Sequence, residues 1–144
     1  MTEVSKCPPH SMFRLDTDRW TEPFWNAARE HRLVVARCAD CGHHRMPPTP
    51  FCPECRSQEI NWVELSGAGE IYTYSIVVRP LIPEVADSVP YVTAVITLEG
   101  SGGVRLISNV VGAPLDELAI GKRVSVFFED TPDGVSIPRF RLAS

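Results

Sequence analysis

The sequence predicts a mainly β protein with one N-terminal helix, in which a zinc ribbon precedes a five-stranded barrel. Three observations support this fold class: two Cys-x-x-Cys pairs, one short helical pattern before them, and a series of β-type segments after residue 66. At 144 residues the chain has the length of one domain, or of two small modules that share a core. We expect a flexible arm over residues 1–17, the helix within 18–32, the zinc ribbon over 33–65 and the barrel over 66–144.

The composition excludes several classes of protein. No run of eighteen apolar residues occurs, so we expect no membrane span, and the first ten residues lack the basic-then-apolar order of a signal peptide. A net charge of −4 disfavours a nucleic-acid partner, because binding phosphates needs a basic excess. We therefore expect a cytoplasmic protein with reduced thiols.

The cysteine pattern predicts one structural zinc ion. Cys38 and Cys41 form one Cys-x-x-Cys knuckle, and Cys52 and Cys55 form the second, ten residues later. Two facing knuckles supply four thiolates in the tetrahedral arrangement that zinc prefers, and four sulfurs leave no open position for catalysis. Two disulfides are the weaker alternative, since bridges within Cys-x-x-Cys are strained. His43 and His44 then have no vacancy to fill, and the remaining Cys7 is expected to be a free thiol.

A helix is predicted over residues 21–32. Thr21 can cap its first turn, where Pro23 is tolerated because its missing N–H would be unpaired there. Three aromatic side chains at this helix, Trp20, Phe24 and Trp25, exceed what a short helix needs to pack on a small domain. They either pack on the chain's own sheet or form an interface with a second protein, and the sequence leaves both interpretations open.

The remaining segments are predicted strands separated by glycine and proline. A short apolar strand over 33–37 leads into the first knuckle, and the alternating segment 60–65 leaves the ribbon. Five further strands follow, over residues 70–79, 91–98, 104–111, 122–129 and 135–141, with a helical turn at 114–118. A short helix between the third and fourth of five strands is the order of an OB-fold, and Pro138 marks an edge strand or the end of the last strand.

Several of these motifs together resemble one known family. They are Pro23-Phe24-Trp25, Arg37-Cys38-x-x-Cys41-Gly42, Pro47-Pro48, Cys52-Pro53-x-Cys55, Gly69-x-Ile71-Tyr72-Thr73-Tyr74, Pro90-Tyr91, Ile120-Gly121, Val124, Phe128-Glu129-Asp130 and Pro138-Arg139-Phe140. The chain resembles, over roughly residues 18 to 144, the family catalogued as domain of unknown function thirty-five. The resemblance implies a rubredoxin-like zinc ribbon followed by an OB-fold.

The resemblance also implies a function. Members of that family accompany thiolase-fold proteins: acyl-CoA thiolases, hydroxymethylglutaryl-CoA synthase and lipid-transfer-type enzymes that cleave steroid side-chain acyl-CoA by retro-aldol chemistry. This chain would then be an accessory subunit in a two-plus-two complex, with Arg37, Arg45, Arg79 and Arg139 as candidate contacts for CoA phosphates. Read from its residues, the chain presents no nucleophile–base set and no phosphate loop, so we expect no catalysis by the chain alone.

The alternative function is binding of single-stranded nucleic acid, for which OB-folds and zinc ribbons are common scaffolds. Tyr72 and Tyr74 are predicted to share one face of their strand, where bases could stack, although Ile76 and Val78 continue that face as a core stripe would. The acidic balance disfavours this alternative.

Overall fold

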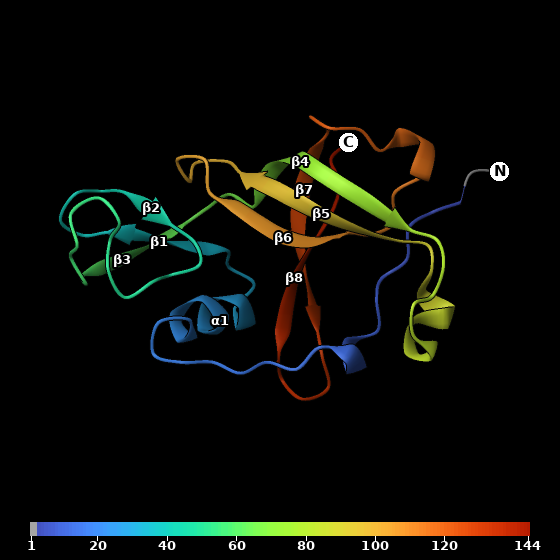
Figure 1. Cartoon of the computed structure of the whole chain (residues 1–144), viewed down its shortest axis with the longest axis horizontal. Coiled ribbons are helices and arrows are strands. Elements are labelled where there is room, and N and C mark those ends of the chain that lie inside the picture. Colours follow the sequence, from blue (N-terminus) through green and yellow to red (C-terminus); the bar gives the residue numbers. More distant parts are fainter. Residues whose placement is uncertain (1–2) are drawn as a thin grey trace.

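The zinc ribbon and the barrel lie end to end in the computed structural model, which describes residues 3–144 (Figure 1). The ribbon is a three-stranded antiparallel sheet in the order β2-β1-β3, made of His44–Arg45, Val34–Cys38 and Ile60–Glu64. The barrel consists of β4 (Ala68–Val77), β5 (Tyr91–Leu98), β6 (Arg105–Val110), β7 (Arg123–Asp130) and β8 (Ser136–Leu142). Three 3₁₀ turns complete the fold, at His10–Met12 (η1), Pro83–Ser88 (η2) and Leu115–Glu117 (η3).

The predicted OB-fold is confirmed. The barrel is closed in the order β4-β5-β6-β8-β7, and all neighbouring pairs are antiparallel except β6 and β8. This is the strand order of a five-stranded Greek-key barrel, and η3 takes the place of the predicted helical turn between the third and fourth strands. Its interior is filled by fully buried apolar side chains, among them Ile71, Ile96 and Phe140.

The helix α1 (Glu22–Arg29) joins the arm to the ribbon and packs with Phe24, Ala27 and Ala28 buried. The sequence predicted Thr21 as its cap, but the Thr21 side chain makes no capping bond to the helix. Instead, one carboxylate oxygen of Asp18 accepts hydrogen bonds from the backbone N–H groups of Trp20 and Thr21. Asp18 therefore organises the entry to the helix, because its side chain binds the N–H of the N-cap residue Thr21 and that of the residue before it.

The helix ends in a Schellman motif at His31. The N–H groups of His31 and Arg32 donate to the carbonyls of Ala28 and Ala27, and His31 has the left-handed φ of 58° that usually requires glycine. The imidazole is held from the barrel side: its ring stacks on Phe128, and Nε2 lies 2.9 Å from an Asp130 carboxylate oxygen. These two contacts to β7 orient α1 against the barrel.

A bulge in β4 separates two tyrosines that the sequence placed on one face. The register of β4 against β5 shifts between Ile71 and Thr73, so Tyr72 faces solvent while Tyr74 packs against the core. The Tyr74 hydroxyl donates to the carbonyl of Leu118, and the Arg105 guanidinium lies 3.8 Å from the centre of the Tyr72 ring. The prediction of a shared face was wrong because an extra residue reverses the alternation of a strand.

The barrel closes through one residue pair between β6 and β8, Val110 with Phe140. Pro138, which the sequence placed on an edge or at the end of its strand, lies in β8 just before this pair and is matched on its other side by Phe128 of β7. The strand is thus inside a closed barrel, but the proline occupies the stretch where β8 has no ladder to β6. There the Ser108 hydroxyl bridges the two strands by donating to the Pro138 carbonyl at 2.7 Å.

The start of the chain is paired with the barrel, where the sequence indicated a flexible arm. Val4 and Lys6 form isolated bridges with Pro114 and Tyr91, and Ser5 between them is 3% exposed. The Ser5 hydroxyl donates to the Val110 carbonyl and accepts from the Ala113 N–H. These contacts could not be predicted from the sequence, because a three-residue segment has no periodicity to detect. Between residues 3 and 144, no helix has the length and apolar character needed to cross a membrane.

We predict that Ser5→Ala lowers the free energy of unfolding by about 2 kcal/mol, because two buried backbone groups lose their partner. Ser11→Ala, at an exposed position in the same arm, is the control and should change it by less than about 0.5 kcal/mol. Urea denaturation of the zinc-loaded protein measures both. Equal stabilities for the two variants would mean that the arm is detached in solution.

Candidate metal centre and neighbouring pockets

The four predicted ligands meet at one point of the ribbon. The Sγ atoms of Cys38, Cys41, Cys52 and Cys55 all lie within 4.8 Å of one another. Cys38 Sγ is 3.5 Å from Cys55 Sγ, and Cys41 Sγ is 3.6 Å from Cys52 Sγ. A tetrahedral zinc with Zn–S bonds of about 2.3 Å requires sulfurs about 3.8 Å apart, so the arrangement fits the ion. The four cysteines form a site for one structural zinc.

The backbone prepares the sulfurs for this role. A hydrogen bond from the backbone of Cys41, supported by one from Asp40, lowers the pKa of the Cys38 thiol to about 6. Because zinc binds thiolates, backbone N–H groups that stabilise negative sulfur favour metal binding. Cys38 and Cys52 are buried while Cys41 and Cys55 are exposed, so the site sits at the edge of the ribbon.

The two histidines after the first knuckle do not belong to the four-residue cluster. His43 is exposed, and His44 in β2 packs against the β5–β6 turn, where a Cβ on Gly102 would lie 2.9 Å from its Nδ1. Burial lowers the pKa of His44, and the neighbouring Arg37 and His43 add to the effect. His44 therefore belongs to the contact between ribbon and barrel.

The four arginines proposed from the sequence as CoA contacts do not form one cluster. Arg37 and Arg45 lie on the neighbouring strands β1 and β2, next to His44 and Ala36 respectively in the register. Arg79 is exposed in the loop after β4, at the end of the barrel away from the ribbon (Figure 1). Arg139 is 6% exposed, and Glu129 and Asn109 occupy its guanidinium.

Cys7 lies beside the ion pair between Arg139 and Glu129. Burial raises the pKa of its thiol, the positive charge of Arg139 opposes the rise, and the adjacent Glu129 carboxylate adds to it. The thiol is thus protonated at neutral pH, and it has the character of a packing residue with a weak hydrogen-bond donor.

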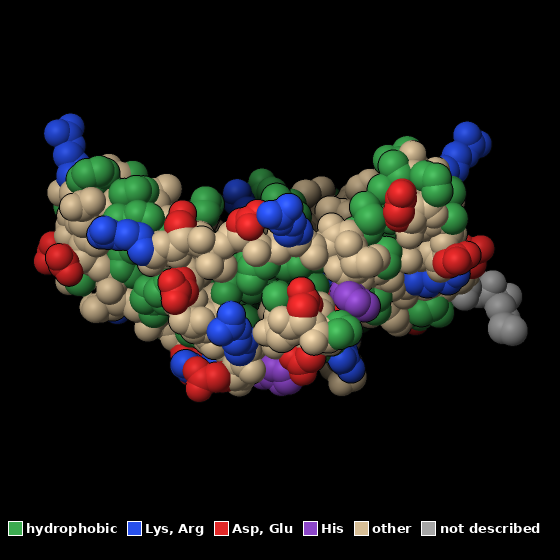
Figure 2. Space-filling model, turned by 90° about the horizontal axis from the view of Figure 1, so that it is seen from below, with side chains coloured by type: hydrophobic (Ala, Val, Ile, Leu, Met, Phe, Trp, Pro, Cys, Tyr) green, Lys and Arg blue, Asp and Glu red, His purple; other side chains and the backbone are tan. Residues whose placement is uncertain are grey.

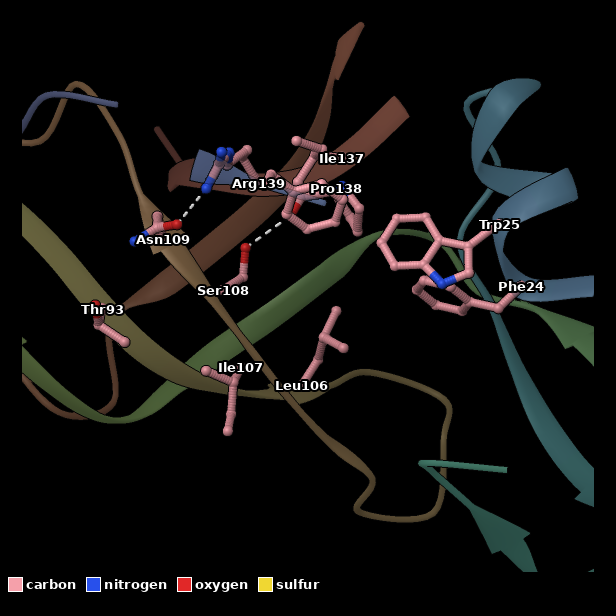
Figure 3. Close-up of a pocket in the computed structure, with 11 residues that line it drawn as sticks. Phe24, Trp25, Thr93, Leu106, Ile107, Ser108, Asn109, Ile137, Pro138 and Arg139 are labelled. Carbon is pink, nitrogen blue, oxygen red and sulfur yellow. Dashed lines mark hydrogen bonds between the residues drawn. The ribbon is translucent and has the colours of Figure 1, made fainter. Parts of the chain in front are cut away.

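The aromatic residues of α1 line a pocket against the barrel (Figure 3). This pocket of about 330 Å³ lies between Phe24 and Trp25 on one side and strands β6 and β8 on the other. Phe24 is 5% exposed and belongs to the core, which is the first interpretation that the sequence left open. Trp25 is half-buried and packs edge-on against Phe13 and Phe24. Trp20 lies outside the pocket, with the Arg19 guanidinium 4.6 Å from its ring centre.

One cluster brings serine, histidine and aspartate together, which the sequence did not indicate. Asp130 at the end of β7 accepts a hydrogen bond from the Ser136 hydroxyl and contacts His31 Nε2. These two contacts lower the pKa of Asp130. Ser136 is buried and bonded to the carboxylate rather than to the imidazole, so the cluster lacks the nucleophile–base contact of a hydrolase. It joins α1 to the barrel.

We predict that Cys38→Ser loses the zinc ion and unfolds the ribbon, because structural zinc supplies on the order of 10 kcal/mol of folding free energy. Metal content and the absorption spectrum of the Co²⁺-substituted protein measure the site. Cys7→Ser is the matched control and should retain one metal ion per chain. A Cys38→Ser variant that keeps both metal and fold would disprove the structural role.

The chain is similar to proteins of known families. Residues 25–61 match the ChsH2 rubredoxin-like zinc ribbon domain, and residues 62–129 match the ChsH2 C-terminal OB-fold domain. A probable enoyl-CoA hydratase alpha subunit of Thermomonospora curvata is 39% identical over 121 residues. A 3-oxo-4,17-pregnadiene-20-carboxyl-CoA hydratase alpha subunit of Mycobacterium tuberculosis is 35% identical over 125 residues. These matches cover 83% and 87% of this chain but only 37% and 39% of the two relatives.

Other relatives have the length of this chain. A solved structure described as the Ltp2-ChsH2(DUF35) aldolase matches 91% of this chain and 100% of its own, with a TM-score of 0.81 and 36% identity. A DUF35 protein of unknown function from Sulfolobus solfataricus has a TM-score of 0.64 at 19% identity, which shows the shared fold, and covers 88% and 87% of the two chains. A DUF35 domain-containing scaffold protein of Methanocaldococcus jannaschii is 35% identical, covering 82% of this chain and 86% of the relative. The chain belongs to the DUF35 family.

Proposed function

We propose that this chain is a non-catalytic accessory subunit that binds and stabilises a thiolase-fold enzyme acting on acyl-CoA, of the thiolase or lipid-transfer aldolase type. One observation carries the proposal: the chain resembles, over nearly its whole length, a chain of the Ltp2-ChsH2(DUF35) aldolase. The names of other relatives also describe members of assemblies, as alpha subunits or scaffold proteins. The pregnadiene carboxyl-CoA in one of these names supports a role in steroid side-chain degradation.

The site geometry supports an accessory role. The zinc ligands fill a tetrahedron with sulfur, and the Ser136–Asp130–His31 cluster lacks a nucleophile–base contact. In this proposal the reacting groups belong to the partner, in a two-plus-two complex in the cytoplasm, where the thiols stay reduced.

The pocket at α1 is the proposed partner surface. Trp25 offers a half-buried aromatic ring, and Ile107 on β6, at the rim of the same pocket, is 73% exposed. Tryptophan side chains anchored in a pocket are enriched among binding hot spots. Trp20 remains a proposed peripheral contact, whereas Phe24 acts through the core by supporting the Trp25 ring.

The four proposed CoA contacts differ in where they lie and in whether their guanidinium already has partners. Arg37 pairs with His44 and Arg45 pairs with Ala36, so the two arginines lie on opposite faces of the ribbon. Arg45 is favoured as a CoA contact over Arg37, because Arg45 lines a cavity at the junction of ribbon and barrel and Arg37 does not. Arg79 lies at the opposite end of the barrel, and the guanidinium of Arg139 is already bound by its own carboxylate and amide partners.

Nucleic-acid binding is not favoured. The bulge in β4 places Tyr72 outside and Tyr74 inside the barrel, so the two rings do not form a stacking platform. On the face shown in Figure 2, basic and acidic side chains are interspersed rather than gathered into a basic stripe.

We predict that the chain, co-expressed with the thiolase-fold protein encoded nearest to it, purifies as a stable complex with equal numbers of the two chains. Size-exclusion chromatography with light scattering gives the stoichiometry, and a thioester-cleavage assay gives the activity. Activity should require the partner and be absent from this chain alone. Thioester cleavage by the isolated chain, or a companion of hydratase type only, would contradict the proposal.

The pocket can be tested with two equally exposed isoleucines. Ile107→Asp should weaken partner binding at least tenfold, while Ile120→Asp, at a residue 70% exposed and outside the pocket, should change it less than twofold. Trp25→Ala should weaken the complex more than it destabilises the isolated fold. Calorimetric titration and thermal melting separate these two effects. Equal losses in the two isoleucine variants would place the interface elsewhere.

A further inference from the structure

Arg45 is a buried cation, and two of its three guanidinium nitrogens have no hydrogen-bond partner among residues 3–144. The residue is 6% exposed, and its Nε donates to the Thr49 carbonyl at 3.0 Å. Its Nη1 and Nη2 atoms are buried, and nothing within residues 3–144 hydrogen-bonds to either of them. A guanidinium is costly to bury without an acceptor, so an unpaired one implies an acceptor that comes from outside the chain.

Arg45 lines a second cavity, of about 560 Å³, at the junction between ribbon and barrel. The ribbon side consists of residues from β2 and the proline-rich segment after it, and the barrel side consists of the β5–β6 turn with Gly102, Gly103 and Arg105. Two arginines line the cavity, and its lining within the described chain includes no Asp or Glu. A cavity of this size accommodates a small ligand, and its charge favours an anion.

Two internal explanations for Arg45 fail. The zinc-binding sulfurs are acceptors in the same ribbon, but none is a hydrogen-bond partner of its Nη atoms. Aromatic rings also stabilise arginines, and the cation–π contacts found among residues 3–144 involve Arg19, Arg105 and Arg141 instead. The other buried arginine, Arg139, differs from Arg45 in this respect. Its guanidinium donates hydrogen bonds to Glu129 and Asn109.

We propose that this cavity binds a phosphate-type oxyanion of a small ligand, with Arg45 as the anchor and Arg105 as a second cation. The two Nη atoms are buried beside the cavity, and a rotation of the guanidinium into the cavity would set them against two oxygens of a phosphate. This is the bidentate geometry that arginine favours. Arg105 is exposed and its guanidinium lies over the Tyr72 ring, so it can turn toward the bound anion. That the phosphate belongs to an acyl-CoA rests on the proposed function, whereas the anion site itself does not.

The test uses the zinc-loaded full chain with pyrophosphate as the probe, titrated by calorimetry at constant ionic strength. Wild-type protein should bind one pyrophosphate, and Arg45→Met should weaken binding at least tenfold. Arg79→Met, at the exposed arginine on the far end of the barrel, is the matched control and should bind within twofold of wild type. In buffer without phosphate the melting temperature of Arg45→Met should not fall, because the substitution removes an unpaired buried charge.

Two further measurements cover a variant that does not fold and the source of the bound anion. If Arg45→Met does not fold, the ¹⁵N signals of the Arg45 guanidinium in the wild-type protein should still shift when pyrophosphate is added. Absence of pyrophosphate binding, unshifted Arg45 signals, or equal binding by Arg45→Met would overturn the site. Inorganic phosphate and an acyl-CoA, titrated in parallel, distinguish the sources of the anion. Pyrophosphate binding without acyl-CoA binding would retain the site and contradict only its assignment to the CoA of the proposed function.

Discussion

The tetrahedron of sulfurs is the constraint on which the N-terminal half depends. The ribbon sheet has three strands, of which β2 contains only His44 and Arg45, and such a sheet buries too little apolar surface to be stable alone. A zinc ion between the two knuckles fixes both ends of the β1–β2 connection and the turn before β3. Because α1 packs on β1 and β8, and the ribbon packs on the β5–β6 turn, the metal also sets where Trp25 and Arg45 lie relative to the barrel.

Much of this architecture could be predicted from the sequence because its signals are local. The cysteine spacing indicated the metal site, alternating segments indicated the barrel strands to within a few residues, and the pattern over residues 21–32 indicated the helix. The strand β2 was missed because two residues carry no pattern. Thr21 occupies the predicted N-cap position, but its hydroxyl contacts Asp18 instead of making a capping bond to the helix. The bulge in β4 was missed because Tyr72, Tyr74 and Ile76 alternate in the sequence as they would in a regular strand.

The candidate sites were harder to predict from the sequence than the fold. Arginines at positions 37, 45, 79 and 139 are indistinguishable in a sequence, since what separates them is burial and the presence of an acceptor. Arg139 and Glu129 pair across adjacent strands, and the His31–Asp130 contact joins residues far apart in the chain. Contacts of this kind follow from how the ribbon, the helix and the barrel are assembled, which no local pattern records.

The pairing of the first residues with the barrel has a consequence for loss of the metal. Ser5 is hydrogen-bonded to the barrel and β4 is one of its strands, and the helix and ribbon lie between these two points in the chain. A ribbon that releases its ion is then a tethered loop with both ends fixed. Its four thiols remain confined to a small volume, so recapture of the ion requires only closure of a loop whose ends are already in place. Metal exchange can thus proceed by local opening while the barrel stays closed.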